Sequence, residues 1–331
     1  MTGPTAWRVS HEHRVEYEIV ESQDLLAPRN DALLSGGRRG GSHRFVVVDE
    51  NVDWLHGAAI RTYFERNDVE ARVVVHPGGE EAKSVEAYLG LLQQLDAFPI
   101  DRRDEPVIAI GGGVLTDLVG FVAASYRRGV SHLRVPTTLM GYVDASVGVK
   151  TAINFQGHKN RVGAFAAPSR VLLDRAFLQT LPERHILNGT CEIVKLAVIA
   201  DLSLFELLEE HGLASVQSNY QDEPGGRILR RAIQGMVQEL EPDLFEARLA
   251  RRMDFGHTFS YGLETLPASP WLHGEAVLVD VLVSTVLAAN RGLLSAAEMA
   301  RIFRLAAHLG VDLHAELADP GALWPCVEER T

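Results

Sequence analysis

Short apolar runs alternate with helical periodicity through the first half of the 331-residue chain. The runs are rich in β-branched residues and occupy residues 44–49 (RFVVVD), 71–77 (ARVVVHP) and 106–113 (PVIAIGGG). Between the last two, residues 84–95 (SVEAYLGLLQQL) carry apolar side chains at helical spacing. Strands that alternate with helices predict an α/β fold with a parallel, Rossmann-like sheet.

Beyond about Pro168 long helical periodicity replaces this pattern, as in residues 183–199 and 274–294. We therefore predict a Rossmann-like N-terminal domain, residues 1–170, and a mainly α-helical C-terminal domain, residues 171–331. Sites in α/β proteins usually lie in the cleft beside such a sheet. The polar stretch 218–226 (SNYQDEPGG) predicts a surface loop. The last residues, WPCVEERT, lack the closing strand or helix of a finished domain. We therefore expect the natural C-terminus to extend further.

Charge and cysteine usage narrow the class of protein. A formal net charge of -12 argues against nucleic acid as the main partner. Cys191 and Cys326 form no C-x-x-C pair and indicate a reducing compartment. The polar N-terminus has no signal-peptide core, and the longest apolar stretch, residues 277–289, contains Asp280 and is short for a membrane span. We expect a cytoplasmic protein with no membrane or nucleic-acid partner.

A glycine turn could hold a dinucleotide. Gly111, Gly112 and Gly113 follow an apolar strand and precede a helical segment, where backbone N–H groups can receive a pyrophosphate. The turn is not G-x-G-x-x-G, so a plain strand-to-helix turn is about as good an interpretation. Asp49 ends the first apolar strand, a usual position for a carboxylate that binds ribose hydroxyls. A turn aspartate is the alternative.

Cations gather in residues 132–165, a segment rich in glycine and hydroxyl side chains. Lys150, Lys159, Asn160 and Arg161 stand among small and apolar residues rather than on a periodic polar face. Buried cations require a compensating anion, which a phosphorylated substrate would supply. The alternative is a loop with solvated lysines.

Glu192, His257 and His273 are candidate metal ligands. One carboxylate and two imidazoles leave an open coordination position on zinc, as a catalytic site requires. They are far apart in the sequence, and hydrogen-bonded structural histidines are the commoner alternative.

Together these segments resemble the sugar phosphate cyclase superfamily, to which 3-dehydroquinate synthase belongs. The resemblance runs from about Asp49 to Gly292. It rests on nine blocks in the family's order: GGGVLTDLVGF, YRRG, RVPTTL, VDASVGVKT, GHKNRVGAF, LPERHILNG, CEIVK, DFGHTF and LHGEAV. It implies a Rossmann-like domain, a helical metal-binding domain, bound NAD, zinc or cobalt, and a homodimer.

The resemblance also implies roles for individual residues. The metal ligands would be Glu192, His257 and His273. The NAD contacts would be Asp49, Glu80, Lys83, Gly112, Gly113, Asp117, Thr137, Thr138, Lys159 and Thr180. The catalytic and substrate-binding set would be Arg128, Asp144, Lys150, Asn160 and Lys195, with Asp144 also near the cofactor.

Departures from the residues of dehydroquinate synthases narrow the choice of substrate. Dehydroquinate synthases have a lysine, an arginine and an asparagine where this chain has Met236, Ala250 and Asp254. Without those cations a substrate carboxylate would lack partners. The remaining blocks look closer to sedoheptulose 7-phosphate cyclases, which make C7-cyclitols. The 2-epi-5-epi-valiolone synthases typically differ at Met236, Ala250 and Tyr261, so we lean towards a 2-epi-valiolone-type product.

The implied reaction oxidises a substrate alcohol with NAD, eliminates phosphate, returns the hydride and closes a carbocycle by aldol addition. Metal and NAD are then retained rather than consumed. Alternatives are a 3-dehydroquinate synthase or another sugar phosphate cyclase, an alcohol dehydrogenase of the glycerol dehydrogenase type, and a catalytically inactive homologue.

Overall fold

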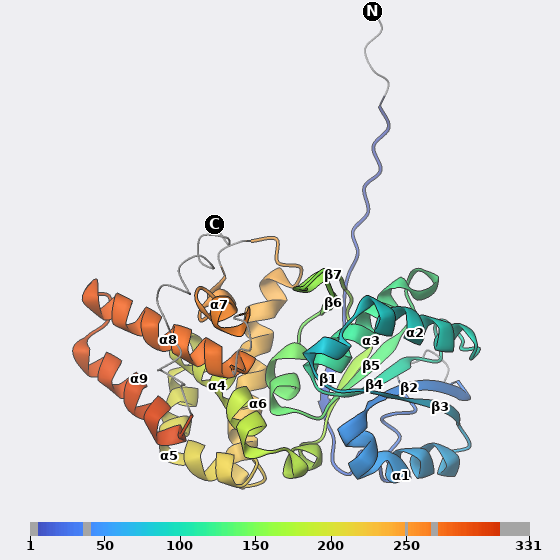
Figure 1. The fold of residues 1–331 in the computed structure, drawn as a ribbon, viewed down its shortest axis with the longest axis horizontal. Coiled ribbons are helices and arrows are strands. Elements are labelled where there is room, and N and C mark those ends of the chain that lie inside the picture. Colours follow the sequence, from blue (N-terminus) through green and yellow to red (C-terminus); the bar gives the residue numbers. More distant parts are fainter. Residues whose placement is uncertain (1–5, 36–40, 249–250, 266–270, 312–331) are drawn as a thin grey trace, which may run out of the picture.

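A computed structural model describes residues 6–35, 41–248, 251–265 and 271–311 of the chain. Ala250 and the chain's last residues, on which two of the predictions above rest, lie outside these ranges. Figure 1 shows a sheet-containing part, coloured blue to green, beside a helical part, coloured yellow to red.

The first part is built on a six-stranded sheet in which every pairing of neighbours is parallel. Its strands, in spatial order, are β1 (Glu18–Glu21), β8 (Arg170–Leu173), β5 (His132–Pro136), β4 (Val107–Gly111), β2 (His43–Asp49) and β3 (Glu70–His76). The helices of this part are α1 (Glu50–Arg66), α2 (Val85–Asp96) and α3 (Gly113–Ser125). The predicted parallel, Rossmann-like arrangement is confirmed.

Both faces of this sheet are covered by other parts of the protein, so the strands carry apolar side chains on both faces. Val47 and Ala109 pack in one cluster with Leu118 of α3. Their neighbours along the strands, Val46 and Ile108, point the other way and pack with residues of α1. The continuous apolar runs of the sequence follow from this double burial.

The strand order reverses beside β2, since β3 lies on one side of it and β4 on the other. Loops that leave the carboxyl ends of two such strands diverge, and ligands of open α/β sheets bind in the crevice between them. Asp49 ends β2 and Gly111 ends β4, so the predicted cofactor residues lie at this point.

A separate antiparallel hairpin, β6 (Lys150–Phe155) and β7 (His158–Phe165), packs against α3. The buried guanidinium of Arg134 in β5 donates to the carbonyl oxygens of Gly148 at 2.7 Å and Ala166 at 3.3 Å. Arg134 therefore holds both ends of the hairpin against the sheet.

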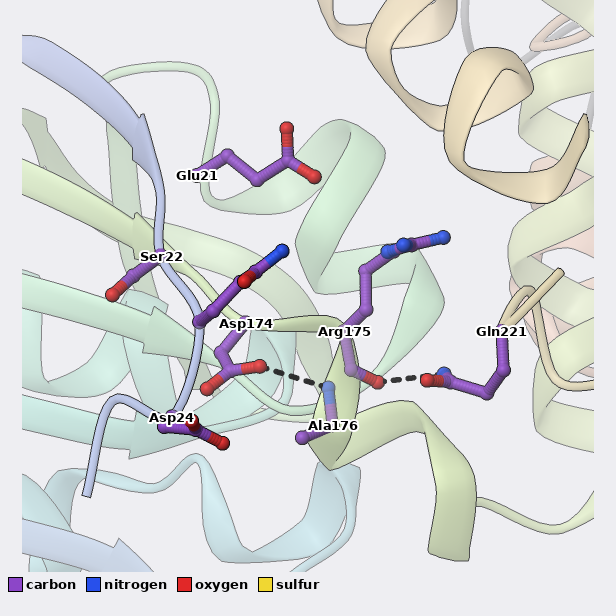
Figure 2. Close-up of a pocket in the computed structure, with 8 residues that line it drawn as sticks. Glu21, Ser22, Asp24, Asp174, Arg175, Ala176 and Gln221 are labelled. Atoms are coloured by element: carbon purple, nitrogen blue, oxygen red, sulfur yellow. Dashed lines mark hydrogen bonds between the residues drawn. The ribbon is translucent and has the colours of Figure 1, made fainter. Parts of the chain in front are cut away.

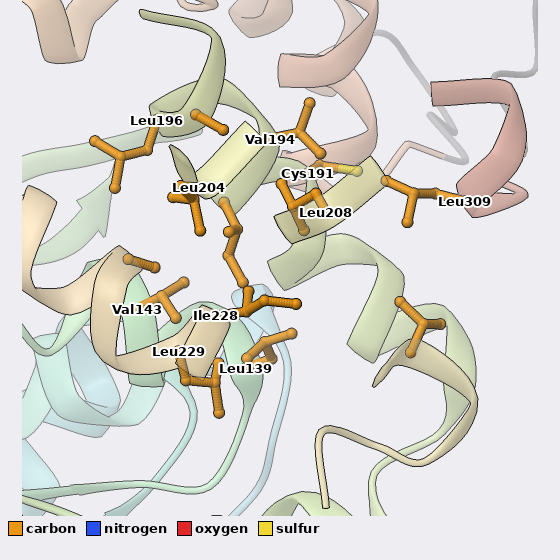
Figure 3. Close-up of a cluster of buried hydrophobic side chains, with 14 of the residues drawn as sticks. Leu139, Val143, Cys191, Val194, Leu196, Leu204, Leu208, Ile228, Leu229 and Leu309 are labelled. Carbon is orange, nitrogen blue, oxygen red and sulfur yellow. The ribbon is translucent and has the colours of Figure 1, made fainter. Parts of the chain in front are cut away.

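The second part consists of α4 (Glu183–Ala200), α5 (Leu202–Gln217), α6 (Glu223–Leu240), α7 (Ser260–Thr265), α8 (His273–Asn290) and α9 (Ala296–Leu309). Short turns of 3₁₀ or π type occupy Glu80–Ala82, Tyr126–Arg128, Gly141–Ala145, Arg175–Thr180, Glu241–Asp243 and Arg252–Asp254. Figure 3 shows the core of this part, where Leu139 and Val143 from the segment after β5 lie among leucines of the helices. The two parts therefore share one apolar cluster.

Two details differ from the sequence prediction. Strand β8 spans the predicted boundary at residues 170 and 171 and belongs to the sheet, and the first long helix begins only at Glu183. The predicted loop 218–226 is too long, because α6 begins at Glu223 with Pro224 in its first turn.

Helix α8 alone among the described helices is long and apolar enough, by length and composition, to cross a membrane. Half of its apolar window is buried within the protein. Its Asp280 is fully buried and accepts hydrogen bonds from backbone N–H groups of Phe259 and Ser260. These contacts are those of a core helix.

Candidate active site

Glu192, His257 and His273 come together in the helical part. One ligand atom from each lies within 4.8 Å of the others. Glu192 lies in the middle of α4, His257 lies between the turn Arg252–Asp254 and α7, and His273 is the first residue of α8. Three elements thus form a cluster that spacing along the chain could not reveal.

The packing of α4 against α8 sets the distance between Glu192 and His273. The backbone N–H of Gly274 donates to Asn188 Oδ1 of α4 at 2.7 Å. A Cβ on Gly274 would overlap the carbonyl oxygen of Asn188, so only glycine permits this approach. Asn188 lies one helical turn before Glu192, which places the carboxylate beside His273.

The position of His257 depends on a left-handed glycine. Gly256 has a φ of +81°, and a Cβ there would lie 2.9 Å from Val277 Cγ1. After the histidine the chain enters α7, and the N–H groups of Phe259 and Ser260 at its start donate to the carboxylate of Asp280. Gly256 and Asp280 thus fix the segment on both sides of His257.

The donor set fits a divalent cation. Glu192 is buried, and neither of its oxygens receives a well-aligned hydrogen bond from the described part of the chain. Lys195 Nζ lies 2.6 Å from Glu192 Oε2, and His273 Nε2 lies 3.3 Å from Oε1. One carboxylate oxygen and two imidazole nitrogens would leave zinc or cobalt a free position.

The charges of this cluster depend on one another. Burial raises the pKa of Glu192, but Lys195 and His273 outweigh it and hold the pKa of Glu192 well below its usual range. Burial lowers the pKa of His273, but the neighbouring carboxylates of Glu192 and Glu264 raise it to about 10. Burial, reinforced by Glu192, raises the pKa of Asp144. The cluster is therefore a compact, buried set of opposite charges.

Glu264 is a member of the site that sequence reasoning missed. Its Oε1 lies 3.0 Å from His273 Nδ1, and its Oε2 lies 3.4 Å from Lys159 Nζ. The only signal in the sequence is a carboxylate on the segment that follows His257, and it became meaningful only once α7 was placed against α8.

The glycine turn lies against the carboxyl ends of β2 and β5. A Cβ on Gly111 would lie 3.2 Å from Asp49 Cβ, and one on Gly112 would lie 3.0 Å from Thr138 Cγ2. Asp49 caps α1 by accepting a hydrogen bond from the N–H of Asn51 at 2.9 Å. The close approach at Gly111 and Gly112 leaves a cradle that larger residues would fill.

Several predicted cofactor residues tie the hairpin to the sheet-containing part. Buried Lys83 donates to Asp117 Oδ2 at 2.6 Å and also to Asn160 Oδ1. Burial raises the pKa of Asp117, and Lys83 opposes that shift. Glu80 accepts a hydrogen bond from Asn154 at 2.8 Å.

Two predicted cofactor threonines lie in the sheet-containing part and the turn after it. The backbone N–H of Thr137, just after β5, donates to the carbonyl oxygen of Gly111. Thr180 ends the turn Arg175–Thr180 and its hydroxyl is 3.4 Å from the carbonyl oxygen of Phe177.

The expectation that the cations of residues 132–165 are buried is wrong. Lys150 has a side chain that is 65% exposed, and Asn160 and Arg161 are exposed as well. Lys159 is one-third exposed. The reason is the hairpin, which packs one face on α3 and presents the other outward. The buried cations among the predicted site residues are Lys83 and Lys195 instead.

Lys150 belongs to a chain of ion pairs. Its Nζ lies 2.7 Å from Glu246 Oε1, Glu246 also pairs with Arg251, and Arg251 pairs with Asp254 at 2.6 Å. Two cations and two carboxylates compensate one another. Met236, at the first departure from the dehydroquinate synthases, is buried in α6. Arg128 lies in the turn Tyr126–Arg128, with a φ of +64°.

A small polar pocket lies elsewhere, at the carboxyl ends of β1 and β8 (Figure 2). Asp174 in its wall accepts hydrogen bonds from the N–H groups of Leu25 and Ala176. Arg175 donates to the carbonyl oxygens of Tyr220 and Asp222. These groups join the sheet to the helices, and none of the predicted site residues lines the pocket.

The chain matches two family models along most of its length. The model of the 3-dehydroquinate synthase N-terminal region covers residues 73–188, and that of the C-terminal region covers residues 189–328. A 2-epi-5-epi-valiolone synthase of Streptomyces albus is 46% identical over 96% of this chain and 79% of its own length. A 3-dehydroquinate synthase of Thermoanaerobacter pseudethanolicus is 35% identical over 83% of this chain and 78% of its own length.

Solved structures of other proteins also resemble this chain. ValA, a 2-epi-5-epi-valiolone synthase from Streptomyces hygroscopicus solved with NAD+ and Zn2+ bound, superposes with a TM-score of 0.91 at 41% identity. The match covers 98% of this chain and 88% of that one. A glycerol dehydrogenase from Schizosaccharomyces pombe has a TM-score of 0.68 at 16% identity over 95% of this chain and 82% of its own, a likeness of fold alone.

Proposed function

Because this chain belongs to the 3-dehydroquinate synthase family, we propose that it is a sugar phosphate cyclase that converts sedoheptulose 7-phosphate into a C7-cyclitol. The observation that carries the proposal is the cluster of Glu192, His257 and His273 beside buried Lys195. This cluster lies in the helical part. The sheet-containing part presents the glycine turn at the point where the strand order of the parallel sheet reverses. ValA, which binds NAD+ and Zn2+, shares this fold over nearly its whole length.

Glu192, His257 and His273 would hold a divalent cation, zinc or cobalt. A bound cation there supplies a Lewis acid for the substrate oxygen that passes between alcohol and ketone. Lys195 lies 2.6 Å from the carboxylate of Glu192 and would donate to a substrate hydroxyl at the same centre. Its burial gives that hydrogen bond strength in a medium of low dielectric constant.

NAD would bind at the carboxyl ends of β2 and β4. Bound NAD supplies a hydride acceptor that becomes a hydride donor later in the same cycle. The residues that we assign to it are Asp49, Glu80, Lys83, Gly112, Gly113, Asp117, Thr137, Thr138, Lys159 and Thr180. Gly112 and Gly113 permit the close approach, because side chains there would meet Thr138 and Ala145.

The substrate would lie between these two sites. We assign Arg128, Lys150 and Asn160 to its phosphate and hydroxyl groups, and Asp144 and Lys195 to the reacting centre. Lys150 is largely exposed on the hairpin, which suits a phosphate that must enter and leave. Held in one conformation, the product of phosphate loss needs little further help to close its ring.

The ion pairs around Glu246 support a substrate without a carboxylate. Arg251 is already paired with both Glu246 and Asp254. A substrate carboxylate at this end would have to displace a carboxylate of the protein. Sedoheptulose 7-phosphate places neutral hydroxyl groups there.

The product proposed is a valiolone-type cyclitol. The relatives named 2-epi-5-epi-valiolone synthase make that compound the first one to look for. Because Met236 and Tyr261 differ from the residues typical of 2-epi-5-epi-valiolone synthases, 2-epi-valiolone is the second compound to look for. We also propose a cytoplasmic homodimer, in keeping with the family.

One experiment separates this function from its rivals. Purified protein is incubated with sedoheptulose 7-phosphate, a trace of NAD and zinc or cobalt, while phosphate release and absorbance at 340 nm are followed. We expect many equivalents of phosphate per NAD, no net change at 340 nm, and a cyclitol identified by NMR. Steady NADH accumulation would indicate a dehydrogenase. Turnover of 3-deoxy-arabino-heptulosonate 7-phosphate with sedoheptulose 7-phosphate untouched would indicate a dehydroquinate synthase.

A further inference from the structure

The carboxylate of Glu264 joins two elements that lie far apart in the sequence. Oε1 lies 3.0 Å from Nδ1 of His273 at the start of α8, and Oε2 lies 3.4 Å from Nζ of Lys159 in β7. The side chain of Glu264 is only 12% exposed. Each oxygen therefore serves a different partner in a mostly buried position.

The first contact settles which ring nitrogen of His273 faces the metal cluster. A neutral imidazole has one N–H and one lone pair, and a carboxylate beside Nδ1 keeps the hydrogen there. Nε2, which lies 3.3 Å from Glu192 Oε1, faces the centre of the cluster and would offer its lone pair to a bound cation in place of its hydrogen. Without Glu264 the ring could turn or take the other tautomer.

The second contact reaches the hairpin. Strand β7 is largely exposed, and its Lys159 forms an ion pair with Glu264 of α7. Its neighbour Asn160 accepts a hydrogen bond from Lys83, which also pairs with Asp117 of α3. Glu264 thus lies between the metal cluster and the residues assigned to NAD.

We propose that Glu264 is a positioning residue that orients His273 for metal binding and, through Lys159, ties the metal centre to the hairpin β6–β7. This role rests on the proposed metal site. Glu264 is not one of the three candidate metal ligands. Its contribution is made through His273 on one side and through Lys159 on the other.

Zinc affinity of the purified protein, measured by competition with a chromophoric chelator, tests the first half. Glu264→Gln keeps an acceptor for Nδ1 but loses the charge, and Glu264→Ala loses both. Replacing such a carboxylate weakens metal binding by about 10- to 100-fold, and we expect the larger loss for Glu264→Ala. The matched control is Glu209→Gln, which removes a carboxylate paired with Arg301 elsewhere in the helical part. The control should bind zinc as the unaltered protein does.

Hydrogen exchange tests the second half. Adding zinc to the metal-free protein should slow amide exchange in residues 158–165, and Glu264→Gln should abolish that protection. Lys159→Gln should abolish it too, while lowering zinc affinity less than Glu264→Gln does. Protection of the hairpin that survives both substitutions would overturn the link.

The outcomes are separable from failure of the function itself. Unchanged zinc affinity in Glu264→Ala overturns the positioning role, and so does a fall in the melting temperature of the metal-free protein with no change in zinc affinity. If the unaltered protein binds no stoichiometric zinc or cobalt, the metal assignment fails, and the positioning role fails with it.

Discussion

The backbone N–H of Ser260 donates to the buried carboxylate of Asp280 at 3.0 Å, and this bond anchors the segment that carries His257. The N–H of Phe259 donates to the same oxygen. Asp280 interrupts an otherwise apolar helix, so its place in the sequence is explained by what it holds. A carboxylate that accepts two backbone N–H groups at the start of α7 also satisfies donors that the helix cannot satisfy itself.

Asp280→Asn should therefore weaken both fold and metal binding. The amide oxygen can still accept from the N–H groups of Phe259 and Ser260, but the bonds lose the negative charge that strengthens them. We expect a loss of about 1–3 kcal/mol in the free energy of unfolding, measured by urea titration of the metal-free protein, and weaker zinc binding. Ser284→Ala is the control, because it removes only the 3.2 Å bond to Asp280 Oδ1 on the far side. Equal zinc affinity in both variants would contradict the anchoring role.

His257→Ala should remove stoichiometric metal and activity while the protein remains folded. The loss follows because two ligands, Glu192 and His273, cannot hold zinc as three can. Metal content by elemental analysis and circular dichroism are the measurements. His185→Ala, on the same helix as Glu192 but outside the cluster, should keep its metal. Full metal content in His257→Ala would end the assignment.

Gly112→Ala should weaken NAD binding by at least about tenfold, since a Cβ 3.0 Å from Thr138 Cγ2 forces the turn to move where the pyrophosphate is expected. Affinity can be followed by calorimetry. Gly90→Ala in α2 is the matched control, because a Cβ there meets nothing within 4 Å. It should leave NAD binding intact and stabilise the fold by about 0.4–1 kcal/mol. NAD binding that is the same in both variants would place the cofactor elsewhere.

Glu246→Gln should make the site more tolerant of a carboxylate. Lys150 and Arg251 lose their shared counter-charge and become available to an anion. Because Lys150 is largely exposed, we expect 3-deoxy-arabino-heptulosonate 7-phosphate to inhibit only about two- to fivefold more strongly. Glu239→Gln removes a similar pair with Arg252 and serves as control. No difference between the variants would show that the ion pairs do not set specificity.

The protein should lose stability as the pH falls below about 6.5. Burial, reinforced by Arg134, holds the pKa of His132 well below its usual value. Below pH 6.5 the unfolded chain therefore binds a proton that the folded chain excludes, and stability falls by up to about 1.4 kcal/mol per pH unit until the folded pKa is reached. His132→Leu should flatten the fall in melting temperature between pH 7 and 5, and His308→Leu, at an exposed site, should not.

Local pattern in the sequence determined the elements and the class of fold. Runs such as RFVVVD and PVIAIGGG are apolar throughout because both faces of the sheet are covered, and that requirement is visible in a single strand. The parallel sheet, the helical second part and the family resemblance were predicted and are confirmed. Gly111 to Gly113 could be located for the same reason, since strand, turn and helix are neighbours in the chain.

Only the tertiary structure decided how distant residues meet. Nothing local marks Glu192 and His273 as neighbours, because their distance depends on how closely α4 and α8 approach at Gly274. The same holds for Glu264, whose two partners lie on different elements. Lys150 was predicted to be buried and is exposed, because apolar neighbours in an antiparallel strand point to the opposite face. Periodicity records the burial of one element, whereas a site is made by the packing of several.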